Sequence, residues 1–383
     1  MRNLKISDIP LVKLPIEMFK GKYLAHFGLH KPGNAGDTLL FLAVRKLFDQ
    51  TNGSYYWNLE QLWDEITDKT IKRLNKISKG IVIGGGGLLL KDTNPNQKSG
   101  WQWSCSIEQL KQIEVPIIVF AIGYNRFRGQ NDFDPVFQEH IQETVRRSIF
   151  FGLRNHGSIR SLKPYLDSSL VQKLNFQPCP TTLLSYLYPE KVDNCFEDGK
   201  RQLTLNMSFD RRQLRFGIRE DEILTSIARA MKWAMQEGWE INLAIHCPGD
   251  NNIEPWLIQE QVMFRKVELG GKPAQEVLDF YSKMPLTIGM RGHSQMIPFG
   301  MGNAIISLIS HDKLAYFLED INHTEWGIDL KSQDIEEQLV EKIKVIDEQR
   351  SMVKMQIINA QKILWNTTVQ NIEMIKIGLK EYR

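Results

Sequence analysis

The pattern that most constrains the fold is a repeated pairing of a short, uninterrupted apolar run with an amphipathic stretch. The apolar runs at residues 22–28, 80–83 and 115–122 each end at or next to a glycine and lack a regular polar alternation. Strands of this kind are buried on both faces, which is typical of a parallel sheet covered by helices. The amphipathic stretches supply those helices, so the sequence predicts an α/β fold.

The first half of the chain is predicted to alternate strands with helices. We expect strands at residues 22–28, 54–57, 80–83, 115–122 and 148–153. We expect helices at residues 37–50, 59–76 and 135–147, and a further helix that opens near Asn155.

A polar run at residues 185–200, rich in Pro, Asn, Asp and Gly, predicts a domain boundary, and the second half repeats the same pattern. We expect strands there at residues 201–207, 240–246, 286–289 and 304–309. We expect helices at residues 221–237, around 252–265, from near Pro273, at 293–301 and from Asp312.

These elements predict an N-terminal α/β domain at residues 1–190, a C-terminal α/β domain at 200–330 and a helical segment at 331–383. Two doubly wound, Rossmann-like domains facing a cleft are the simplest architecture, with ligands at the carboxyl ends of the strands. In the last segment apolar residues recur three or four positions apart, which predicts one or two long helices packed on the body by one face. An oligomer contact or a membrane-surface helix is the alternative.

The composition is that of an ordinary globular protein. The 48 basic and 45 acidic residues give a net charge of +3, and 42% of residues are hydrophobic. This balance argues against a disordered tail and against a polybasic nucleic-acid wrapper, so we expect no nucleic-acid partner. Residues 1–22 lack the apolar run of a signal peptide, and no stretch reaches the roughly 18 apolar residues of a membrane span. We therefore expect a cytoplasmic protein with at most peripheral membrane contact.

The four cysteines are widely spaced and form no CxxC pair: Cys105, Cys179, Cys195 and Cys247. The sequence therefore predicts neither a zinc site nor a disulfide framework. Reduced thiols agree with a cytoplasmic location.

Two glycine-containing segments are candidates for close approach of the backbone to a ligand. The sequence GNAGD at residues 33–37 separates a predicted strand from a helix, so its amides can receive an anion while Asp37 caps the helix. A capped turn without a ligand is the alternative. The four glycines at residues 84–87 match neither a phosphate loop ending in Gly-Lys-Ser/Thr nor a GxGxxG dinucleotide fingerprint.

Cationic side chains at predicted strand ends form the main candidate site. Arg291 and His293 follow the strand at residues 286–289, where a guanidinium can grip an oxyanion while an imidazole exchanges a proton. A salt bridge and a helix-capping histidine are the alternative interpretation. Lys313, after the next strand, is a candidate second anion ligand.

Two further arginines, Arg126 and Arg154, follow strands of the first domain. Together with Arg291 they suggest a dianionic substrate. His246 ends a strand of the second domain and follows the same rule, with a structural role as the alternative. The Trp-Gln-Trp sequence at residues 101–103 either stacks on a sugar or serves ordinary packing.

The ordered set of motifs resembles the polysaccharide pyruvyl transferases. It runs over roughly residues 25 to 320 and comprises GNAGD, IVIGGGG, the strand and loop at 121–127, LRNHGS at 153–158, and MRGHSQMIPFGMGNAIISLISHDK at 290–313. The resemblance implies a fold similar to the glycosyltransferase-B architecture, phosphoenolpyruvate as donor and a sugar with two suitable hydroxyls as acceptor. The product it implies is a cyclic pyruvate ketal on a cell-surface glycan such as an exopolysaccharide, made without a cofactor or metal.

The resemblance also assigns residues. Arg291 and His293 match the family's Arg-x-His, and Arg154 matches its arginine after the middle strand. The family's N-terminal loop is matched by Asn34, Gly36 and Asp37. The chain departs from the family at residues 124–126, Tyr-Asn-Arg, where a Gln-Ser and a His are common, and at Asn155, where an Asp is common.

We therefore hypothesise that His293 protonates the donor, that Asp37 is the base, and that three arginines hold carboxylate and phosphate. The predicted catalytic residues are Asp37, Arg291 and His293. The predicted substrate-binding residues are Asn34, Gly36, Gly85, Gly86, Arg126, Arg154, His246, Ser294 and Lys313.

Two other functions stay open at this point. A nucleotide-sugar-dependent glycosyltransferase also uses two α/β domains and arginines, which grip a diphosphate. A noncatalytic scaffold for glycan assembly would explain the departures from the family pattern. The sequence does not distinguish a lipid-linked from a nucleotide-linked acceptor, and it leaves the oligomeric state open.

Overall fold

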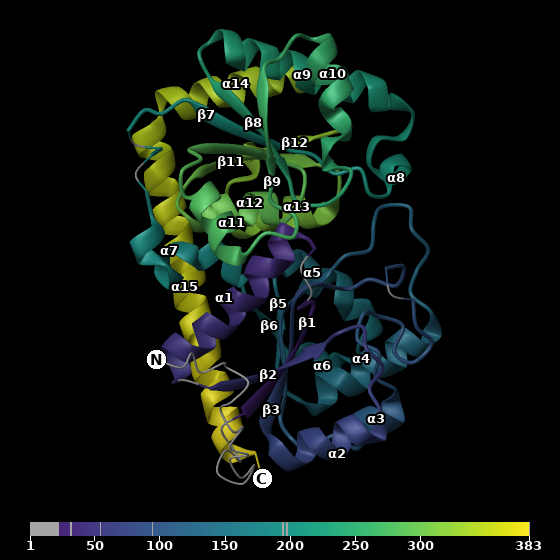
Figure 1. Cartoon of the computed structure of the whole chain (residues 1–383). Helices are drawn as coiled ribbons and strands as arrows, with labels where there is room; N and C mark the ends of the chain where they lie inside the picture. Colours follow the sequence, from purple (N-terminus) through teal and green to yellow (C-terminus); the bar gives the residue numbers. More distant parts are fainter. Residues whose placement is uncertain are drawn as a thin grey trace, which may run out of the picture.

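The computed structural model describes residues 23–30, 33–53, 55–93, 95–193, 195–196 and 198–382. The expectation about a signal peptide concerns residues 1–22, which lie outside the described residues. Two α/β units are stacked one above the other, and a long C-terminal helix runs along both (Figure 1).

The first unit is a six-stranded parallel sheet in the order β2-β1-β3-β4-β5-β6. Its strands are β1 (Tyr23–Gly28), β2 (Tyr56–Gln61), β3 (Ser78–Leu89), β4 (Ile117–Tyr124), β5 (Ser148–Leu153) and β6 (Leu174–Phe176). Its helices are α1 (Ala35–Asn52), α2 (Asp68–Ile77), α3 (Ile107–Lys111), α4 (Pro135–Arg147), α5 (His156–Leu162), α6 (Ser168–Val171) and α7 (Leu184–Leu187).

The second unit is also a six-stranded parallel sheet, in the order β12-β11-β10-β7-β8-β9. Its strands are β7 (Gln202–Asn206), β8 (Glu240–Ile245), β9 (Phe264–Glu268), β10 (Leu286–Gly289), β11 (Ala304–Ile309) and β12 (Gly327–Asp329). Its helices are α8 (Arg212–Phe216), α9 (Glu220–Gln236), α10 (Glu254–Gln259), α11 (Ala274–Tyr281), α12 (His293–Gly300) and α13 (Asp312–Asp320).

This architecture confirms the predicted pair of doubly wound domains with a C-terminal helical segment. In both sheets the strand order reverses beside the first strand of the unit, which opens a crevice at the carboxyl ends of the strands. Along the chain, the polar run at residues 185–200 comes after the last strand of the first sheet, β6, and before the first strand of the second sheet, β7.

Three predicted elements differ from the structure. The helix expected at 59–76 is wrong at its start, because residues up to Gln61 pair with β1 and the helix begins only at Asp68, after the Thr67 cap. The helix expected around 252–265 ends at Gln259, and the chain then forms the partly exposed edge strand β9. The third difference is that β3 does not stop before the glycines but continues through them to Leu89.

The C-terminal segment forms α14 (Ile335–Glu348) and α15 (Arg350–Glu381). Helix α14 packs on α9, whereas α15 contacts α1 and β5 of the first unit and β11 of the second (Figure 1). Its inward face is apolar and buried, as Ile357, Leu364 and Ile372 show. The tertiary packing predicted for this segment is therefore confirmed. None of the helices in the described ranges is long and apolar enough to cross a lipid bilayer.

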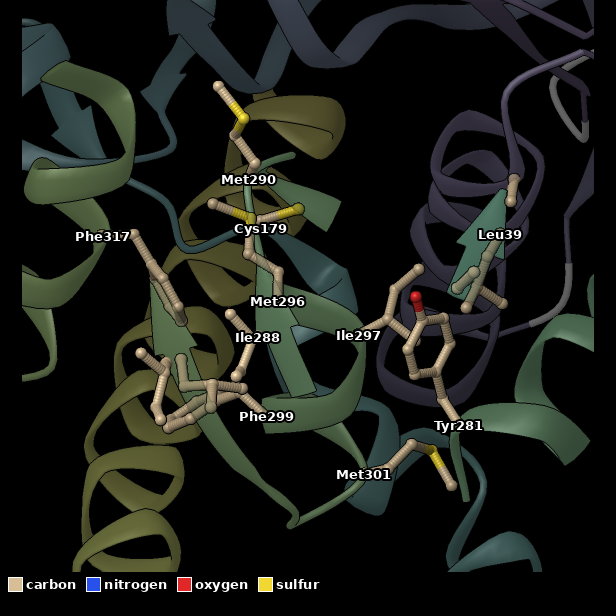
Figure 2. Packing of buried hydrophobic residues seen from close by; sticks show 14 of the residues in the cluster. Leu39, Cys179, Tyr281, Ile288, Met290, Met296, Ile297, Phe299, Met301 and Phe317 are labelled. Carbon is tan, nitrogen blue, oxygen red and sulfur yellow. The ribbon is translucent and has the colours of Figure 1, made fainter. Parts of the chain in front are cut away.

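A single apolar core crosses the boundary between the two units. Leu39 of α1, Tyr281 of α11 and Ile297 of α12 all belong to it (Figure 2). Because buried cores are close-packed, this contact fixes the start of α1 relative to α12. The two walls of the cleft described next are held together by this core.

Candidate active site

A cleft with a cavity volume of about 270 Å³ lies between the two units, where the carboxyl ends of their strands face each other. From the first unit it is lined by Leu29, Asn34, Asp37, Phe41, Trp63, Gly85, Gly86, Gly87, Leu88, Leu90, Thr93, Gln102, Asn125 and Arg154. From the second unit it is lined by Asp210, Arg211, Arg215, Arg291, Gly292, His293 and Lys313. Such a crevice is where doubly wound sheets bind ligands.

The first turn of α1 forms one part of the first wall. The Asn34 side chain caps the helix by accepting a hydrogen bond from the Gly36 amide at 2.7 Å, so Asn34 and not Asp37 is the cap. Asp37, in the same turn, is free to face the cleft. Gly36 does not line the cavity, which differs from its predicted role in substrate binding. A Cβ at this position would lie 2.4 Å from the His293 ring, so the glycine leaves room for the imidazole.

The glycines of β3 form the floor of this wall. Gly85 and Gly86 line the cavity directly. The carbonyl of Gly84 accepts a hydrogen bond from the buried His26 ring, which supports the floor from beneath. The backbone here approaches the cavity without side chains, as the sequence indicated.

Arg154 follows β5 and is 7% exposed, with its guanidinium packed over Gly123. No hydrogen bond or ion pair joins this guanidinium to any residue that the structure describes, and its Nε is buried without a partner. Burial lowers its pKa, and the nearby Cys179 and Asp37 oppose that shift. An unpaired buried cation is costly, so this position suits a bound anion.

Lys313 supplies a second cation from the opposite wall. Burial and the neighbouring Arg154 hold the pKa of its ammonium well below its usual range. Among the residues of known placement, none forms a hydrogen bond or ion pair with this ammonium. Two uncompensated cations from different domains therefore face the same cavity.

The arginines of the second wall are paired. Arg291 donates from Nε to both carboxylate oxygens of Asp250 at 3.0 Å, and Asp250 is fully buried. Arg215 binds Asp210 with two hydrogen bonds of 3.0 Å. Arg211 reaches across the cleft to Asp92 of the first unit, at 2.7 and 2.9 Å. These three arginines carry charges that the protein already neutralises.

His293 lies between two groups of the first unit. Its Nδ1 is 4.0 Å from Asp37 Oδ1, and its Nε2 is 3.8 Å from Cys179 Sγ. Burial, followed by the charge of Arg154, lowers the pKa of His293 to about 3. Burial raises the pKa of Asp37 to about 6, against the opposing charges of Arg291 and Lys313. At neutral pH the protein groups alone thus give a neutral imidazole beside a carboxylate.

Besides Gly36, three other predicted substrate-binding residues do not line the cavity. Arg126 turns out of the cleft because its Nε donates to the Gln130 carbonyl at 3.0 Å and its Nη1 faces Asp132. His246 is fully buried and bonded to the Tyr281 hydroxyl at 2.6 Å, so its role is structural. Ser294 is also buried.

The Ser294 hydroxyl donates to the Arg291 carbonyl at 2.9 Å and accepts from the Arg291 amide at 3.2 Å. These bonds close the turn into α12. Trp101 and Trp103 are fully buried, and Trp101 donates to His140 at 3.0 Å, so they serve packing. Neither tryptophan is available to stack on a sugar.

Several cleft residues were missed by the sequence analysis. Asp210, Arg211 and Arg215 follow β7, so the strand-end rule that pointed to Arg291 also applied to them. Trp63 follows β2, whose end fell inside a predicted helix. No group of three or more His, Cys, Asp or Glu side chains able to hold a metal ion occurs within the described residues.

The family comparison connects this geometry to known proteins. A family model described as polysaccharide pyruvyl transferase matches residues 34–308. The chain belongs to this family. The matched range includes both walls of the cleft except Leu29 and Lys313. A comparison with curated proteins found no significant match.

Two solved structures share the fold. A putative UDP-N-acetylglucosamine 2-epimerase from Listeria monocytogenes superposes with a TM-score of 0.55 at 11% identity, covering 88% of this chain and 91% of that one. UDP-GlcNAc 2-epimerase from Neisseria meningitidis, bound to UDP-GlcNAc, gives 0.52 at 12% identity, covering 91% and 99%. At this identity the likeness concerns the fold alone, which is similar to the glycosyltransferase-B architecture.

Proposed function

We propose that this member of the pyruvyl transferase family transfers pyruvyl from phosphoenolpyruvate to two hydroxyls of a sugar, forming a cyclic ketal for a cell-surface glycan. The observation that carries the proposal is the pair of unpaired cations, Arg154 and Lys313, beside His293 in the interdomain cleft. Phosphoenolpyruvate offers a carboxylate and a phosphate, and each is a strong acceptor for a cationic donor.

The donor is held between the domains. Arg154 and Lys313 bind its two anionic groups, which removes the cost of burying their charges. Arg291 lines the same cavity, but Asp250 binds its Nε and Nη2 and its Nη1 lies 3.4 Å from Asp210 Oδ1, so it acts as a rigid support. Arg126 takes no part, because its guanidinium lies outside the cavity.

The first chemical step is protonation of the methylene carbon of the enol. Among the protein groups alone His293 is neutral, because burial, Arg154, His246 and Lys313 disfavour its charged form. Donor charges that neutralise Arg154 and Lys313 raise its pKa, so that binding recruits a proton to the imidazole. Transfer of this proton leaves a methyl group and an oxocarbenium-like centre, which the adjacent anionic groups stabilise.

Two sugar hydroxyls then add to this centre. The first forms one C–O bond and yields its proton to Asp37, the C–O bond to phosphate breaks, and the second hydroxyl closes the ring. Of the two hydroxyl protons, one replaces that given to the methyl group and the other leaves with phosphate. Asp37 suits the base role because its carboxyl, with a pKa of about 6, is ionised at neutral pH and lies 4.0 Å from His293.

The test is mass spectrometry of a panel of sugars incubated with the protein and phosphoenolpyruvate. The proposal predicts a product heavier by pyruvic acid minus one water, together with release of inorganic phosphate. His293→Ala protein is the matched control and forms product about 10²–10⁴-fold more slowly. A protein that neither modifies a sugar nor is thermally stabilised by phosphoenolpyruvate contradicts the proposal, because a ligand of the native state must stabilise it.

The same panel separates the alternatives. A nucleotide-sugar-dependent glycosyltransferase would release a nucleoside diphosphate from a sugar donor and ignore phosphoenolpyruvate. A scaffold would do neither.

A further inference from the structure

The mouth of the cleft carries an exposed tryptophan. Trp63 lines the cavity and is 45% exposed. Its indole N–H donates to the Gln102 side-chain carbonyl at 3.0 Å, and the Gln102 amide donates in turn to the Leu90 carbonyl at 2.5 Å. Because the polar edge of the indole is bound inside the protein, the surface left exposed is the apolar ring.

A second feature of the cavity is an amide with unused hydrogen-bonding capacity. The Asn125 side-chain carbonyl oxygen is buried and has no hydrogen-bond partner among the described residues. Asn125 is fixed at the cavity by its backbone amide, which donates to the Leu89 carbonyl at 2.9 Å. Its side chain occupies space that a Cβ on Gly87 would take, 2.8 Å from Nδ2. A buried carbonyl oxygen without a donor is stabilised when a ligand hydroxyl supplies one.

The cavity is lined both by unpaired cations and by cations that the protein neutralises. The unpaired cations Arg154 and Lys313 surround His293 and Asp37. Arg211 also lines the cavity and contacts Asp92 and Thr93 of the first unit, and Asp92 neutralises its guanidinium. A ligand that contacts Trp63 and Asn125 therefore meets an aromatic face and an uncharged hydrogen-bond acceptor.

We propose that Trp63 and Asn125 form the acceptor subsite, which takes a neutral pyranose ring. A pyranose has an apolar C–H face and a polar rim, and an aromatic ring in a partly polar pocket matches that face. The ring lies on Trp63, and one of its hydroxyls donates to the Asn125 carbonyl oxygen. This places other hydroxyls toward Asp37 and the donor. The inference rests on the proposed function, since the sugar is the acceptor of that reaction.

The experiment is saturation-transfer NMR on the full chain in the presence of phosphoenolpyruvate. The probes are methyl glycosides of glucose, galactose, mannose and N-acetylglucosamine. The wild-type protein is expected to transfer saturation to the C–H face of at least one probe, with an affinity measured by titration. Trp63→Ala weakens that affinity about tenfold or more, Trp63→Phe retains most of it, and Asn125→Ala weakens it severalfold.

Two controls distinguish a failure of the acceptor subsite from a failure of the proposed function. Tyr56→Ala removes an equally exposed aromatic ring outside the cleft and leaves sugar binding unchanged. Calorimetric titration with phosphoenolpyruvate measures the donor site, whose affinity Trp63→Ala changes by less than twofold. If wild-type protein does not bind phosphoenolpyruvate, the proposed function fails. If the donor binds but no probe does, or Trp63→Ala binds sugars as well as wild type, the acceptor subsite is wrong. Equal losses of donor and sugar affinity in Trp63→Ala also overturn it.

Discussion

The two walls of the cleft are built by different means. The wall of the first domain consists of backbone at Gly85 and Gly86, a capped helix start, and the isolated guanidinium of Arg154. The wall of the second domain is a network of charge pairs, in which Arg291 is bound by the buried Asp250. The difference shows which cations serve the architecture and which are left for a ligand, something that a count of arginines cannot tell.

Lys313 is the exception within the second wall, because it has no acid partner in the described structure. Among the neighbouring charges, Arg154 lowers its pKa most. Each domain therefore contributes one uncompensated cation to the same place. The apolar core that includes residues of both units holds these two cations at the same cavity.

The largest expected effect comes from the group that both walls surround. His293→Ala removes the proposed proton donor and lowers turnover by about 10²–10⁴-fold, the range for a positioned acid. Donor binding, measured by calorimetry, stays within a few fold because Arg154 and Lys313 remain. Near-normal turnover in this variant would remove His293 from the mechanism.

Breaking a pair in the second wall is expected to affect folding first. Arg291→Gln leaves the carboxylate of Asp250 buried without its cation, at a cost of about 3–5 kcal/mol in the free energy of unfolding. Denaturant titration measures the loss. The double variant with Asp250→Asn recovers part of it, and a single Arg291→Gln variant as stable as wild type would show that the pair is not a support.

Removing the unpaired cation of the first wall is expected to weaken donor binding and to leave the stability of the fold unchanged. Arg154→Gln weakens phosphoenolpyruvate binding by about 10²–10³-fold, since a charge-assisted contact to a buried anion is lost. The free energy of unfolding does not fall, because no protein group loses a partner. A variant that unfolds more easily but binds the donor normally would reverse the roles assigned to Arg154 and Arg291.

The Asp37 carboxyl is expected to make the stability of the protein depend on pH. The folded protein raises the pKa of its carboxyl to about 6, so the folded state holds this proton more tightly than the unfolded chain does. The stabilisation is complete below pH about 4 and is lost as pH rises through about 6. Asp37→Asn is therefore expected to stabilise the protein by up to about 3 kcal/mol at pH 8 and hardly at all at pH 4.

Thermal unfolding of the wild-type and Asp37→Asn proteins between pH 4 and pH 8 measures how the stability difference changes with pH. A stability gain that is equal at pH 4 and pH 8 would mean that the Asp37 charge is not its cause. Because Asp37 is also the proposed base, the variant loses turnover at every pH.

The smallest expected effect concerns the contact between the walls. A Cβ at Gly36 would meet the His293 ring, so Gly36→Ala displaces the imidazole and lowers turnover by about tenfold, a barrier change of about 1.4 kcal/mol. Gly33→Ala is the matched control, because a Cβ there meets no atom within 4 Å. Equal turnover in the two variants would show that the close approach does not position His293.

The sequence was most informative where strands are short and apolar. The strands at 286–289 and 304–309 have the predicted bounds, and the strand-end rule brought Arg154, His293 and Lys313 to the cleft. It failed where polar, partly exposed edge strands resemble helices, as β2 does. That error also concealed Trp63.

Two other failures concern side chains. The rule gives the position of Arg126 after β4, but the direction of its guanidinium depends on Gln130 and Asp132 in a loop. The pairing of Arg291 with Asp250 spans 41 residues and arises only when β8 and β10 are placed in one sheet. Which arginines are neutralised is thus a tertiary property, which local sequence patterns do not contain.

The central claim, that unpaired rather than paired cations bind the donor, is tested most directly by calorimetric titration of phosphoenolpyruvate into three proteins. Wild type and Arg211→Gln, which removes a paired arginine of the same cleft, are expected to bind within about fivefold of each other, while Arg154→Gln binds about 10²–10³-fold more weakly. Equal losses in the two variants, or a larger loss in Arg211→Gln, would contradict the account.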